Sequence, residues 1–338
     1  MDLERVKLLR LQNQFLLEPA SAERVVTGLI GLQAQYGANA QHALAIRSNG
    51  GYAADDYVKT WSLRGTLHLH AVCDLPVVLY RGCETEFGQM AFTDESLDSG
   101  RAERFRQVVL KELADGPKSR DVLKQACLRA GMTEDEEAVF MHSWGGLFRG
   151  LSERGEIAYA AEGNRLFLRL EPFRRETKEC ALTEMMRRYL AHYGPATIRD
   201  IQTFFGMPQR SLKLYLERAA GDTVLIGKNM YYLSKEQSEP AMPCPETIFL
   251  AGFDPLMMGY CKTENPFLPR DTAKRVYTNT GIVFPTVLLD GAVTAIWRRA
   301  GTKIMLAPLR GLSAREREII ENKAVDKLAC GAVKWVES

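Results

Sequence analysis

Two short stretches carry the side chains best suited to chemistry, GLQAQYG at residues 31–37 and WSLRGTLHLHA at residues 61–71. The first contains two amides, Gln33 and Gln35. Glutamine is a poor base, so such a pair could act by positioning a reactant and by aiming dipoles at developing charge. Alternatively, both glutamines are ordinary surface residues. The chain lacks a glycine-rich phosphate loop, a GxSxG elbow and an HExxH motif, so catalysis would rest on a less familiar set of residues.

A helix is expected to hold the two amides. Apolar residues with helical spacing occupy much of the range 25–32, and Gly37 could end the helix. On a helix, residues two apart point about 200° away from each other and cannot line one cavity. We therefore expect Gln33 and Gln35 at a frayed helix end, where their side chains can converge.

The second stretch alternates like a strand. Arg64 and His68 are an even number of residues apart, so on a strand they share one face. They could contact phosphate or help to shape a pocket beside the glutamines. Equally, His68 could be a core histidine with satisfied hydrogen bonds and Arg64 a structural ion-pair partner. His70 falls on the same face, and we assign it no role.

A repeated segment organises the middle of the chain. FRQVVLKELADGPKSRD, from Phe105, and MRRYLAHYGPATIRD, from Met186, share one design. Each has an apolar helix, then Gly-Pro, which ends that helix, then a Ser or Thr and an Arg-Asp pair within a second helix. Ser119 and Thr197 stand where the second helix needs an N-cap.

Both copies continue in the same way. A third helix is expected within residues 135–155 in the first copy and 208–221 in the second. A possible hairpin follows, with turns at residues 162–164 and 227–229. Three helices followed by a two-stranded wing are typical of a winged helix, whose third helix can enter a DNA groove. The alternative is that these modules pack only against protein.

The remaining segments complete a four-domain prediction. Residues 1–100 look like a diverged copy of the repeat, and the proline-rich SEPAMPCPE is a linker. Beyond it, β-branched stretches alternate and the helix SAREREIIENKAVDKLA closes the domain. We predict an α+β protein with winged helices at 1–100, 101–175 and 176–239, and a small β-rich C-terminal domain at 240–338.

Composition limits the partners and the compartment. The net charge of +2 argues weakly against coating nucleic acid by electrostatics alone. No apolar run approaches the roughly 18 residues that span a bilayer, and the first residues resemble an amphipathic helix and not a signal peptide, so we expect a cytoplasmic protein. The seven cysteines are scattered without CxxC spacing. They predict reduced, mostly buried thiols and no metal site.

Cationic residues gather near the C-terminal end, in WRRAGTK and PLRGLSARER. Such a cluster is either a solvated face or a phosphate-binding surface that orients the protein on a duplex. The candidates for phosphate contacts are Lys262, Arg298, Arg299 and Lys303. We expect Asp254 and Asp290 to be turn or cap residues, and Trp61 and Trp297 to be core anchors.

Six short motifs, in this order along the chain, resemble those of the AlkZ/YcaQ-like winged-helix proteins: GLQAQ, RGTLHL, GPAT, FDP, LLDG and IWRR. The resemblance covers nearly the whole chain and implies three tandem winged helices around a concave DNA channel. It also implies hydrolysis of the N-glycosidic bond of N7-alkylated purines, including those in interstrand crosslinks. The family's catalytic motif is Gln-x-Gln in the AlkZ-like branch and Gln-x-Asp in the YcaQ-like branch. Gln33-Ala34-Gln35 therefore resembles the AlkZ-like motif, with Gln33 and Gln35 as catalytic residues.

Two neutral amides are compatible with that chemistry. N7-alkylguanine already carries a positive charge, so the base departs neutral and needs no protonation. Two amides that hold a water below the sugar could then suffice. No lysine nucleophile stands next to the motif, so we expect attack by water, an abasic site without strand cleavage, and no cofactor.

The expected partner is double-stranded DNA that contains alkylated bases, bound by a monomer without an obligate protein partner and away from membranes. One rival is a non-catalytic winged-helix protein, such as a transcription regulator or damage sensor, because fold alone does not imply function. It predicts affinity for an undamaged operator without base release. The other rival is a protein-interaction scaffold, which predicts negligible DNA binding even at low salt.

Overall fold

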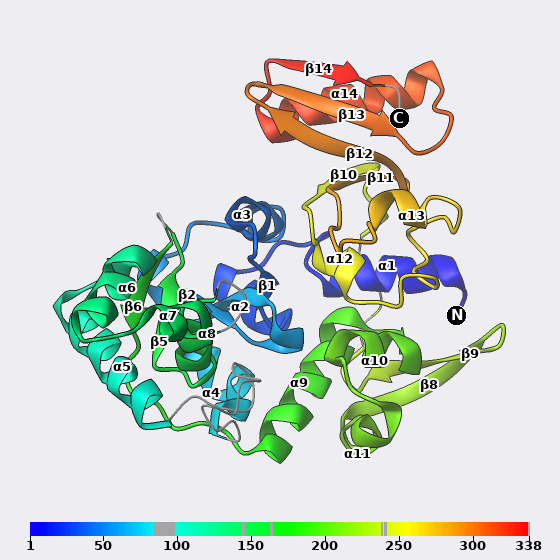
Figure 1. Cartoon of the computed structure of the whole chain (residues 1–338). Helices are drawn as coiled ribbons and strands as arrows, with labels where there is room; N and C mark the ends of the chain where they lie inside the picture. Colours follow the sequence, from blue (N-terminus) through cyan, green and yellow to red (C-terminus); the bar gives the residue numbers. More distant parts are fainter. Residues whose placement is uncertain (84–98, 143–145, 163–164, 238, 240–241, 337–338) are drawn as a thin grey trace. The chain divides into compact units, whose positions relative to one another are not determined.

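The computed structural model describes residues 1–83, 99–142, 146–162, 165–237, 239 and 242–336, and it combines helices with β-sheets (Figure 1). The chain divides into two compact units: unit 1 comprises residues 1–51 and 186–338, and unit 2 comprises residues 52–185. This division is coarser than the four expected domains, and its boundary at residue 51 falls inside the first of them. The four-domain organisation stays a prediction. Within the described ranges, no helix has both the length and the apolar character needed to cross a membrane.

Unit 2 contains the first repeat and the hairpin that precedes it. Its helices are α4 (Leu75–Val78), α5 (Ser99–Glu112), α6 (Arg120–Arg129), α7 (Glu134–Phe140) and α8 (Gly146–Glu153). Its strands are β2 (Tyr57–Trp61), β3 (Leu67–Ala71), β4 (Lys118–Ser119), β5 (Ile157–Ala160) and β6 (Leu166–Arg169). They lie in the order β3-β2-β5-β6-β4, and each neighbouring pair is antiparallel.

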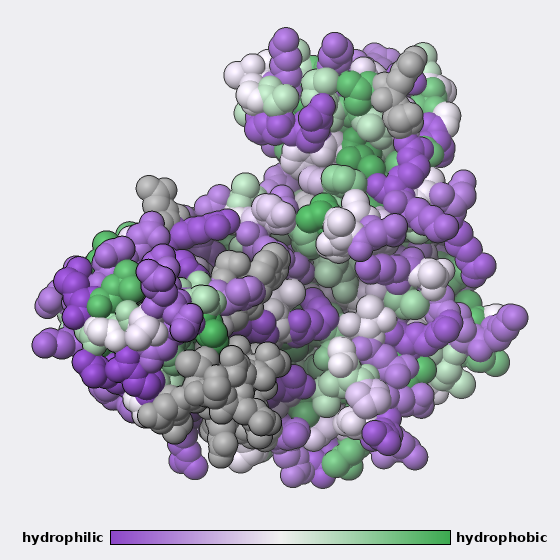
Figure 2. All heavy atoms as spheres, in the orientation of Figure 1, coloured by the Kyte–Doolittle hydropathy of each residue, from purple (hydrophilic) through white to green (hydrophobic). Residues whose placement is uncertain are grey.

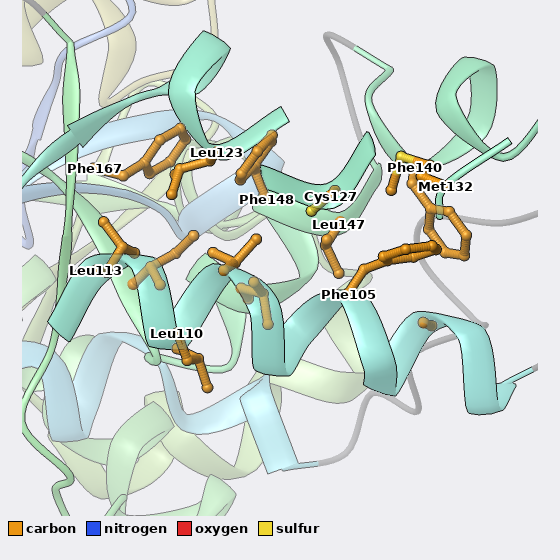
Figure 3. Packing of buried hydrophobic residues seen from close by; sticks show 14 residues of the cluster. Phe105, Leu110, Leu113, Leu123, Cys127, Met132, Phe140, Leu147, Phe148 and Phe167 are labelled. Carbon is orange, nitrogen blue, oxygen red and sulfur yellow. The ribbon is translucent and has the colours of Figure 1, made fainter. Parts of the chain in front are cut away.

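The core of unit 2 forms where the apolar face of α5 meets α6, α7, α8 and β6 (Figure 3). Phe105 is fully buried and meets the edge of Phe140, with ring centroids 5.5 Å apart. Phe148 stacks on Phe167 at 4.9 Å. Trp61 packs against the same cluster, which confirms its predicted role as a core anchor. Removing one such aromatic ring from a core typically costs about 3–5 kcal/mol.

The first repeat follows its predicted order with one difference. Ser119 caps α6, since its side chain accepts a hydrogen bond from the Val122 amide, as predicted. The expected third helix is two helices, α7 and α8. The backbone at Gly146 has a φ of +69°, which ordinary helix does not allow. Strands β5 and β6 form the expected hairpin, but residues 163–164 of its predicted turn lie outside the described residues.

Unit 1 begins with three helices and one short strand: α1 (Leu3–Asn13), α2 (Ala22–Gly28), β1 (Leu32–Gln33) and α3 (Gly37–Ala45). The second repeat supplies α9 (Lys178–Tyr193), of which the part from Met186 onward belongs to this unit, and then β7 (Ala196–Thr197), α10 (Ile198–Phe205), α11 (Gln209–Ala219), β8 (Ala220–Ile226) and β9 (Asn229–Ser234). The C-terminal region adds β10 (Thr247–Leu250), α12 (Pro255–Met258), α13 (Ala273–Val276), β11 (Thr286–Leu289), β12 (Ala292–Ala300), β13 (Lys303–Pro308), α14 (Ala314–Leu328) and β14 (Ala332–Trp335).

The second repeat has the same strand pairing as the first. Strands β7, β8 and β9 lie in the order β7-β9-β8, just as β4, β5 and β6 lie in the order β4-β6-β5. Thr197 caps α10 as predicted, in a capping box with Asp200. The β8–β9 hairpin turns at Gly227 as expected and exposes Leu225 and Met230 near its end. In Figure 2, small apolar patches appear among hydrophilic atoms around α11 and this hairpin.

The C-terminal strands form the predicted β-rich region. They lie in the order β10-β11-β12-β13-β14, and α14 packs on the sheet through Ile320, Ala324 and Leu328. Trp297 belongs to this core, and its indole NH donates to the Leu250 carbonyl at 2.8 Å. The prediction that Trp297 is a core anchor is confirmed.

Two buried ion pairs hold segments of unit 1 that are distant in the sequence. Arg10 on α1 is 1% exposed and lies 2.9 Å from Asp200 on α10. Arg47 and Asp254 are both fully buried, and two guanidinium nitrogens contact the two carboxylate oxygens at 3.0 and 2.6 Å. A buried charge is strongly destabilising when it loses its partner. These pairs therefore hold α1 and the residues just after α3 against segments from the second half of the chain.

The cysteines are free but not mostly buried. Six have described side chains and none of these forms a disulfide. Cys127 and Cys330 are buried, whereas Cys73, Cys180 and Cys244 are exposed. The expectation of mostly buried thiols is therefore wrong, because several cysteines fall in loops and on solvent-facing helix positions.

Candidate active site

The Gln-x-Gln motif begins on a short strand and continues into a bend, so the expectation of a frayed helix end is wrong. Helix α2 ends at Gly28, and the next residues turn the chain through left-handed backbone, with φ of +57° at Ile30 and +88° at Gly31. Gln33 then belongs to β1. Gly37 begins α3 instead of ending the preceding helix. The apolar spacing that predicted one helix comes from a helix followed by a buried strand.

The backbone is extended only at the start of the motif. Strand β1 ends at Gln33, and Gln35 and Tyr36 form a bend before α3, so the period of two of a strand does not reach Gln35. Leu32, Gln33 and Ala34 are all buried, and exposure begins at Gln35. Leu32 and Ala34 are 0% and 3% exposed, Gln33 is 9% exposed, and Gln35 is half-buried.

The Gln33 amide oxygen is buried and has no hydrogen-bond partner among the described residues. Leaving a buried acceptor unpaired costs about 1–3 kcal/mol, so native proteins seldom do so without a reason. A water molecule or a substrate hydroxyl would satisfy this oxygen. The site therefore offers a fixed acceptor that neither charges nor titrates.

Helix α9 holds the segment just before the motif. The Tyr193 hydroxyl donates to the Leu29 carbonyl at 2.9 Å, and Arg188 donates to the Thr27 carbonyl at 3.2 Å. At Gly28, a side chain would collide with the His192 ring, because a Cβ there would lie 2.8 Å from Nε2. These contacts fix the end of α2 and thus the start of the turn that leads into Gln33.

Helix α3 holds the segment just after the motif. His42 contacts the Phe249 carbonyl through Nε2 at 2.8 Å; because a carbonyl only accepts, this nitrogen carries the proton. Burial lowers the pKa of His42, so the ring is neutral at pH 7. One turn earlier, Asn39 packs against Gly252, where a Cβ would meet the amide nitrogen at 2.7 Å. The motif is therefore anchored on both sides within unit 1.

Arg64 and His68 belong to unit 2, and they do not share a strand face. His68 lies on β3, but Arg64 lies in the 3-10 turn Leu63–Gly65 between β2 and β3, with a φ of +55°. The expected common face fails because the strand-like stretch includes the turn of a hairpin. His70, which received no role, is the residue that shares a face with His68: Ser62 contacts both rings through its hydroxyl, at 3.2 and 2.8 Å.

The surroundings of His68 are those of the core-histidine alternative. The ring is 3% exposed, and Nδ1 donates to the Thr66 carbonyl at 2.9 Å. Burial lowers the pKa of His68 well below its usual range, and the charges of Arg64 and His70 lower it further. The ring is therefore neutral at physiological pH. A DNA contact from Arg64 or His68 stays a prediction.

The cationic candidates of the C-terminal sheet divide between two faces of the β12–β13 hairpin. In the register, Arg298 pairs with Met305 and Ala300 pairs with Lys303, so Arg298 and Lys303 share one face. Arg299 faces the opposite side and donates to the Leu328 carbonyl at the end of α14. Lys262, in the turn after α12, lies 4.9 Å from the Tyr277 ring.

The two C-terminal aspartates are turn and cap residues, as predicted. Asp254 caps α12, because its carboxylate accepts from the Leu256 amide at 2.9 Å, and it also holds Arg47. Asp290 has a φ of +49° in the turn between β11 and β12. Sequence reasoning missed two residues beside the motif, Tyr193 and Tyr36. The first looks like any apolar helix residue, but the second stands directly after Gln35 and could have been singled out.

Comparisons with known proteins agree on one family. The family model described as DNA glycosylase AlkZ-like matches residues 26–330. A protein from Streptomyces sahachiroi named interstrand DNA cross-link repair glycosylase is 27% identical over 95% of this chain and 92% of its own length. The solved structure of Streptomyces sahachiroi DNA glycosylase AlkZ has a TM-score of 0.79 at 20% identity, with all of both chains covered. The latter likeness shows that the fold is shared.

Proposed function

The chain belongs to the AlkZ-like family of DNA glycosylases, and from that premise we propose that it hydrolyses the N-glycosidic bond of cationic N7-alkylated purines in DNA. As a glycosylase it is a hydrolase of N-glycosyl bonds that acts on DNA, which sets aside the non-catalytic regulator and the interaction scaffold. One observation supports the specific proposal above others. The buried amide oxygen of Gln33 lies on an anchored strand and meets no partner among the described residues.

Gln33 and Gln35 act in this proposal by holding one water molecule. The amide oxygen of Gln33 accepts a hydrogen bond from the water, and Gln35, two residues further and half-buried, supplies a second polar contact. As the water oxygen bonds to the sugar C1′, the bond from C1′ to the base nitrogen breaks and its electron pair neutralises the cationic base. The proton that the water loses passes to solvent. The amide dipoles face the positive charge that develops on the sugar.

The charge of the lesion explains why no carboxylate is needed. A base that is already cationic leaves as a neutral molecule, so neither a general acid nor a strong base has to act. The nearest sequence neighbours of the motif, residues 25–45, contain no lysine. The product is therefore an abasic site in an uncut strand.

The substrate range extends in this proposal to interstrand crosslinks joined through purine N7. The relative from Streptomyces sahachiroi is named for crosslink repair and aligns with 95% of this chain. A crosslinked purine is also an N7-alkylated cation, so the same bond and the same leaving group are involved. Release of one strand from a crosslinked duplex, on a denaturing gel, would measure this activity.

Three tandem winged helices and a monomer complete the proposal. The recurring order of helix, short strand, helices and hairpin, with the short strand paired to the last one in both repeats, supports two of the modules. For the duplex backbone, Arg298 and Lys303 are the better candidates, since they share one exposed face of their hairpin. Arg299 and Lys262 are weaker ones, because each already contacts another group.

The decisive experiment measures release of N7-methylguanine from a methylated duplex by chromatography. We expect wild-type protein to release the base, and Gln33→Ala to lower the single-turnover rate by about 100-fold, as for loss of one preorganised dipole. The double change Gln33→Ala and Gln35→Ala should leave almost no activity. Gln41→Ala, at an exposed glutamine on α3, is the matched control and should behave as wild type.

Two outcomes would contradict the proposal. Wild-type protein that binds methylated DNA without releasing a base would remove the substrate assignment. Full activity in the double variant would remove the two glutamines from the mechanism. Because neither amide titrates near neutral pH, the rate should also stay within about twofold between pH 6 and 8, unlike that of an enzyme with a histidine base.

A further inference from the structure

Tyr36, directly after the motif, has an aromatic side chain that is largely exposed to solvent. Tyr36 follows Gln35 directly and is 48% exposed, although Leu32 and Ala34 in the same segment are buried. Consecutive Cα atoms are about 3.8 Å apart, so the backbone of Tyr36 lies directly beside that of Gln35 and three residues from Gln33. A ring in this place can touch the same nucleotide as the motif.

Phe253 supports the Tyr36 ring from behind. The two ring centroids are 5.7 Å apart and the rings are only 21° from parallel, which is an offset stack. Phe253 itself is 6% exposed, so one member of the pair is buried and the other faces solvent. The pair is therefore a two-layer stack that ends in an open aromatic surface.

The backbone below the stack is held in an unusual conformation. Phe253 has a φ of +56°, which a residue with a side chain seldom adopts and which surrounding contacts must enforce. Two contacts hold it: the Phe253 amide donates to the Val283 carbonyl at 3.2 Å, and the carboxylate of the next residue, Asp254, binds Arg47. On the other side, Gly252 lets the Asn39 side chain approach closely. The stack is thus a rigid support and not a loose surface residue.

We propose that Tyr36 is the stacking surface for the cationic base that the enzyme removes. A tyrosine ring attracts a cation over its face, and a planar purine also gains from stacking on it. The lesion has both properties, since it is flat and positively charged. Stacking on Tyr36 would hold the purine next to the water that Gln33 and Gln35 position, and it would favour the charged lesion over neutral purines. This inference rests on the proposed function, because the base in question is the N7-alkylated one.

The test compares two duplexes that differ only in the charge of one base. One carries 2′-fluoro-N7-methylguanosine, which is cationic and resists cleavage; the other carries its neutral isostere, 2′-fluoro-7-deaza-7-methylguanosine. We expect wild-type protein to bind the cationic duplex about tenfold more tightly than the neutral one. Tyr36→Leu should lose this preference, whereas Tyr36→Phe and Tyr36→Trp, which keep an aromatic face, should retain it.

Excision kinetics supply the second readout. Tyr36→Leu should slow single-turnover release of N7-methylguanine by about tenfold, and Tyr36→Phe should stay within about twofold of wild type. Phe284→Leu changes another exposed aromatic residue of unit 1 and should leave both measurements unchanged. Thermal unfolding of each variant verifies that it is folded, which is expected for a side chain this exposed.

The outcomes separate this inference from the proposed function. If wild-type protein releases no N7-methylguanine yet prefers the cationic duplex through Tyr36, the excision proposal fails and the stacking surface stands. If wild-type protein excises the base but Tyr36→Leu keeps both the rate and the preference, the stacking surface is overturned and excision stands. Equal wild-type affinity for the two duplexes would also overturn it.

Discussion

The two repeats start from one sequence design and use it differently. The first, from Phe105, surrounds α5 with apolar side chains and forms a core of its own. The second, from Met186, turns polar atoms of the same kind of helix toward other segments: the Tyr193 hydroxyl binds the Leu29 carbonyl and the Tyr189 hydroxyl binds the Gly259 carbonyl, both at 2.9 Å. The first repeat thus buries its helix in a core made mainly of its own side chains, against which Trp61 packs, whereas the second is a scaffold on which the segment before the motif is fixed.

The aspartates of the two Arg-Asp pairs should show the largest difference. Asp200→Ala would leave Arg10 buried without its partner, and we expect a loss of about 3–5 kcal/mol in the free energy of unfolding. Asp121→Ala changes the exposed aspartate of the first repeat, which stands one position closer to its helix cap than Asp200 does, and should cost no more than about 0.5 kcal/mol. Urea denaturation followed by circular dichroism measures both. Equal losses would show that the repeats use this residue alike.

Histidine 192 should make the second repeat sensitive to acid. Burial above all, with the charges of Arg24, Arg187 and Arg188, lowers the pKa of His192 to about 4, although the hydrogen bond to Asn13 acts in the opposite direction. In the unfolded chain His192 binds a proton near pH 6.5, whereas in the folded chain it stays neutral until about pH 4. At pH 7 the residue therefore has no effect on the free energy of unfolding, and it lowers that free energy as the pH falls from 6.5 to 4. The loss reaches about 3 kcal/mol.

The control for acid sensitivity is His192→Asn, which keeps a donor near the Nδ1 position. The unfolding free energy of this variant should fall less steeply between pH 6.5 and 4 than that of wild type, while the contribution of His68 remains. The counterpart of His192 in the first repeat, two residues before its Gly-Pro, is Ala114. This residue is exposed and does not titrate, so the first repeat has no acid-sensitive group at this position. Parallel curves for variant and wild type would contradict the assignment to His192.

Two tyrosines of α9 allow stability and catalysis to be separated. Tyr193→Phe and Tyr189→Phe each remove one buried hydroxyl that donates to a carbonyl, so each should cost about 1–2 kcal/mol. Of these two hydroxyls, that of Tyr193 contacts the turn before Gln33, at the Leu29 carbonyl, whereas that of Tyr189 contacts Gly259. We therefore expect Tyr193→Phe alone to slow base excision by several-fold. Identical excision rates in the two variants would show that the turn needs no such support.

The smallest difference concerns the helix caps. Ser119→Ala removes a cap at a half-buried position of the first repeat and should cost about 0.5–1 kcal/mol. Thr197→Ala removes a buried cap with a reciprocal capping box and should cost about 1–2 kcal/mol. Hydrogen exchange in the first turn of α6 and of α10 would locate each loss. A larger loss at Ser119 than at Thr197 would reverse the comparison.

Local chemistry made part of the fold predictable from the sequence. Ser119 and Thr197 were recognisable as caps because Gly-Pro precedes each of them, and α14 and the C-terminal strands followed from their periodicity. Gln33 was found as a candidate, but its conformation was not. Ile30 adopts a left-handed backbone that its type gives no reason to expect, and this turn converts an apparent helix into a strand.

Contacts between segments that are distant in the sequence could not be predicted. Arg10 is one of several basic residues on an amphipathic helix, and arginine is rarely buried, so its burial could not be foreseen. Its partner Asp200 lies 190 residues away. The same limit applies to Tyr36, whose importance depends on Phe253 beneath it. A contact between distant segments is decided by packing and leaves no mark on either segment alone.

The order β7-β9-β8 has a practical consequence for the protein in solution. Among the residues that the structure describes, it leaves β8, a strand of seven residues, at the edge of its sheet, and such an edge is a template on which another chain can pair. The exposed Leu225 makes such pairing more favourable. Against it stand the charge of Asp222 and the shift in register between Ala220 and Thr223, which interrupts the ladder. Asp222 and the interrupted ladder are therefore features of β8 that oppose pairing with a second chain.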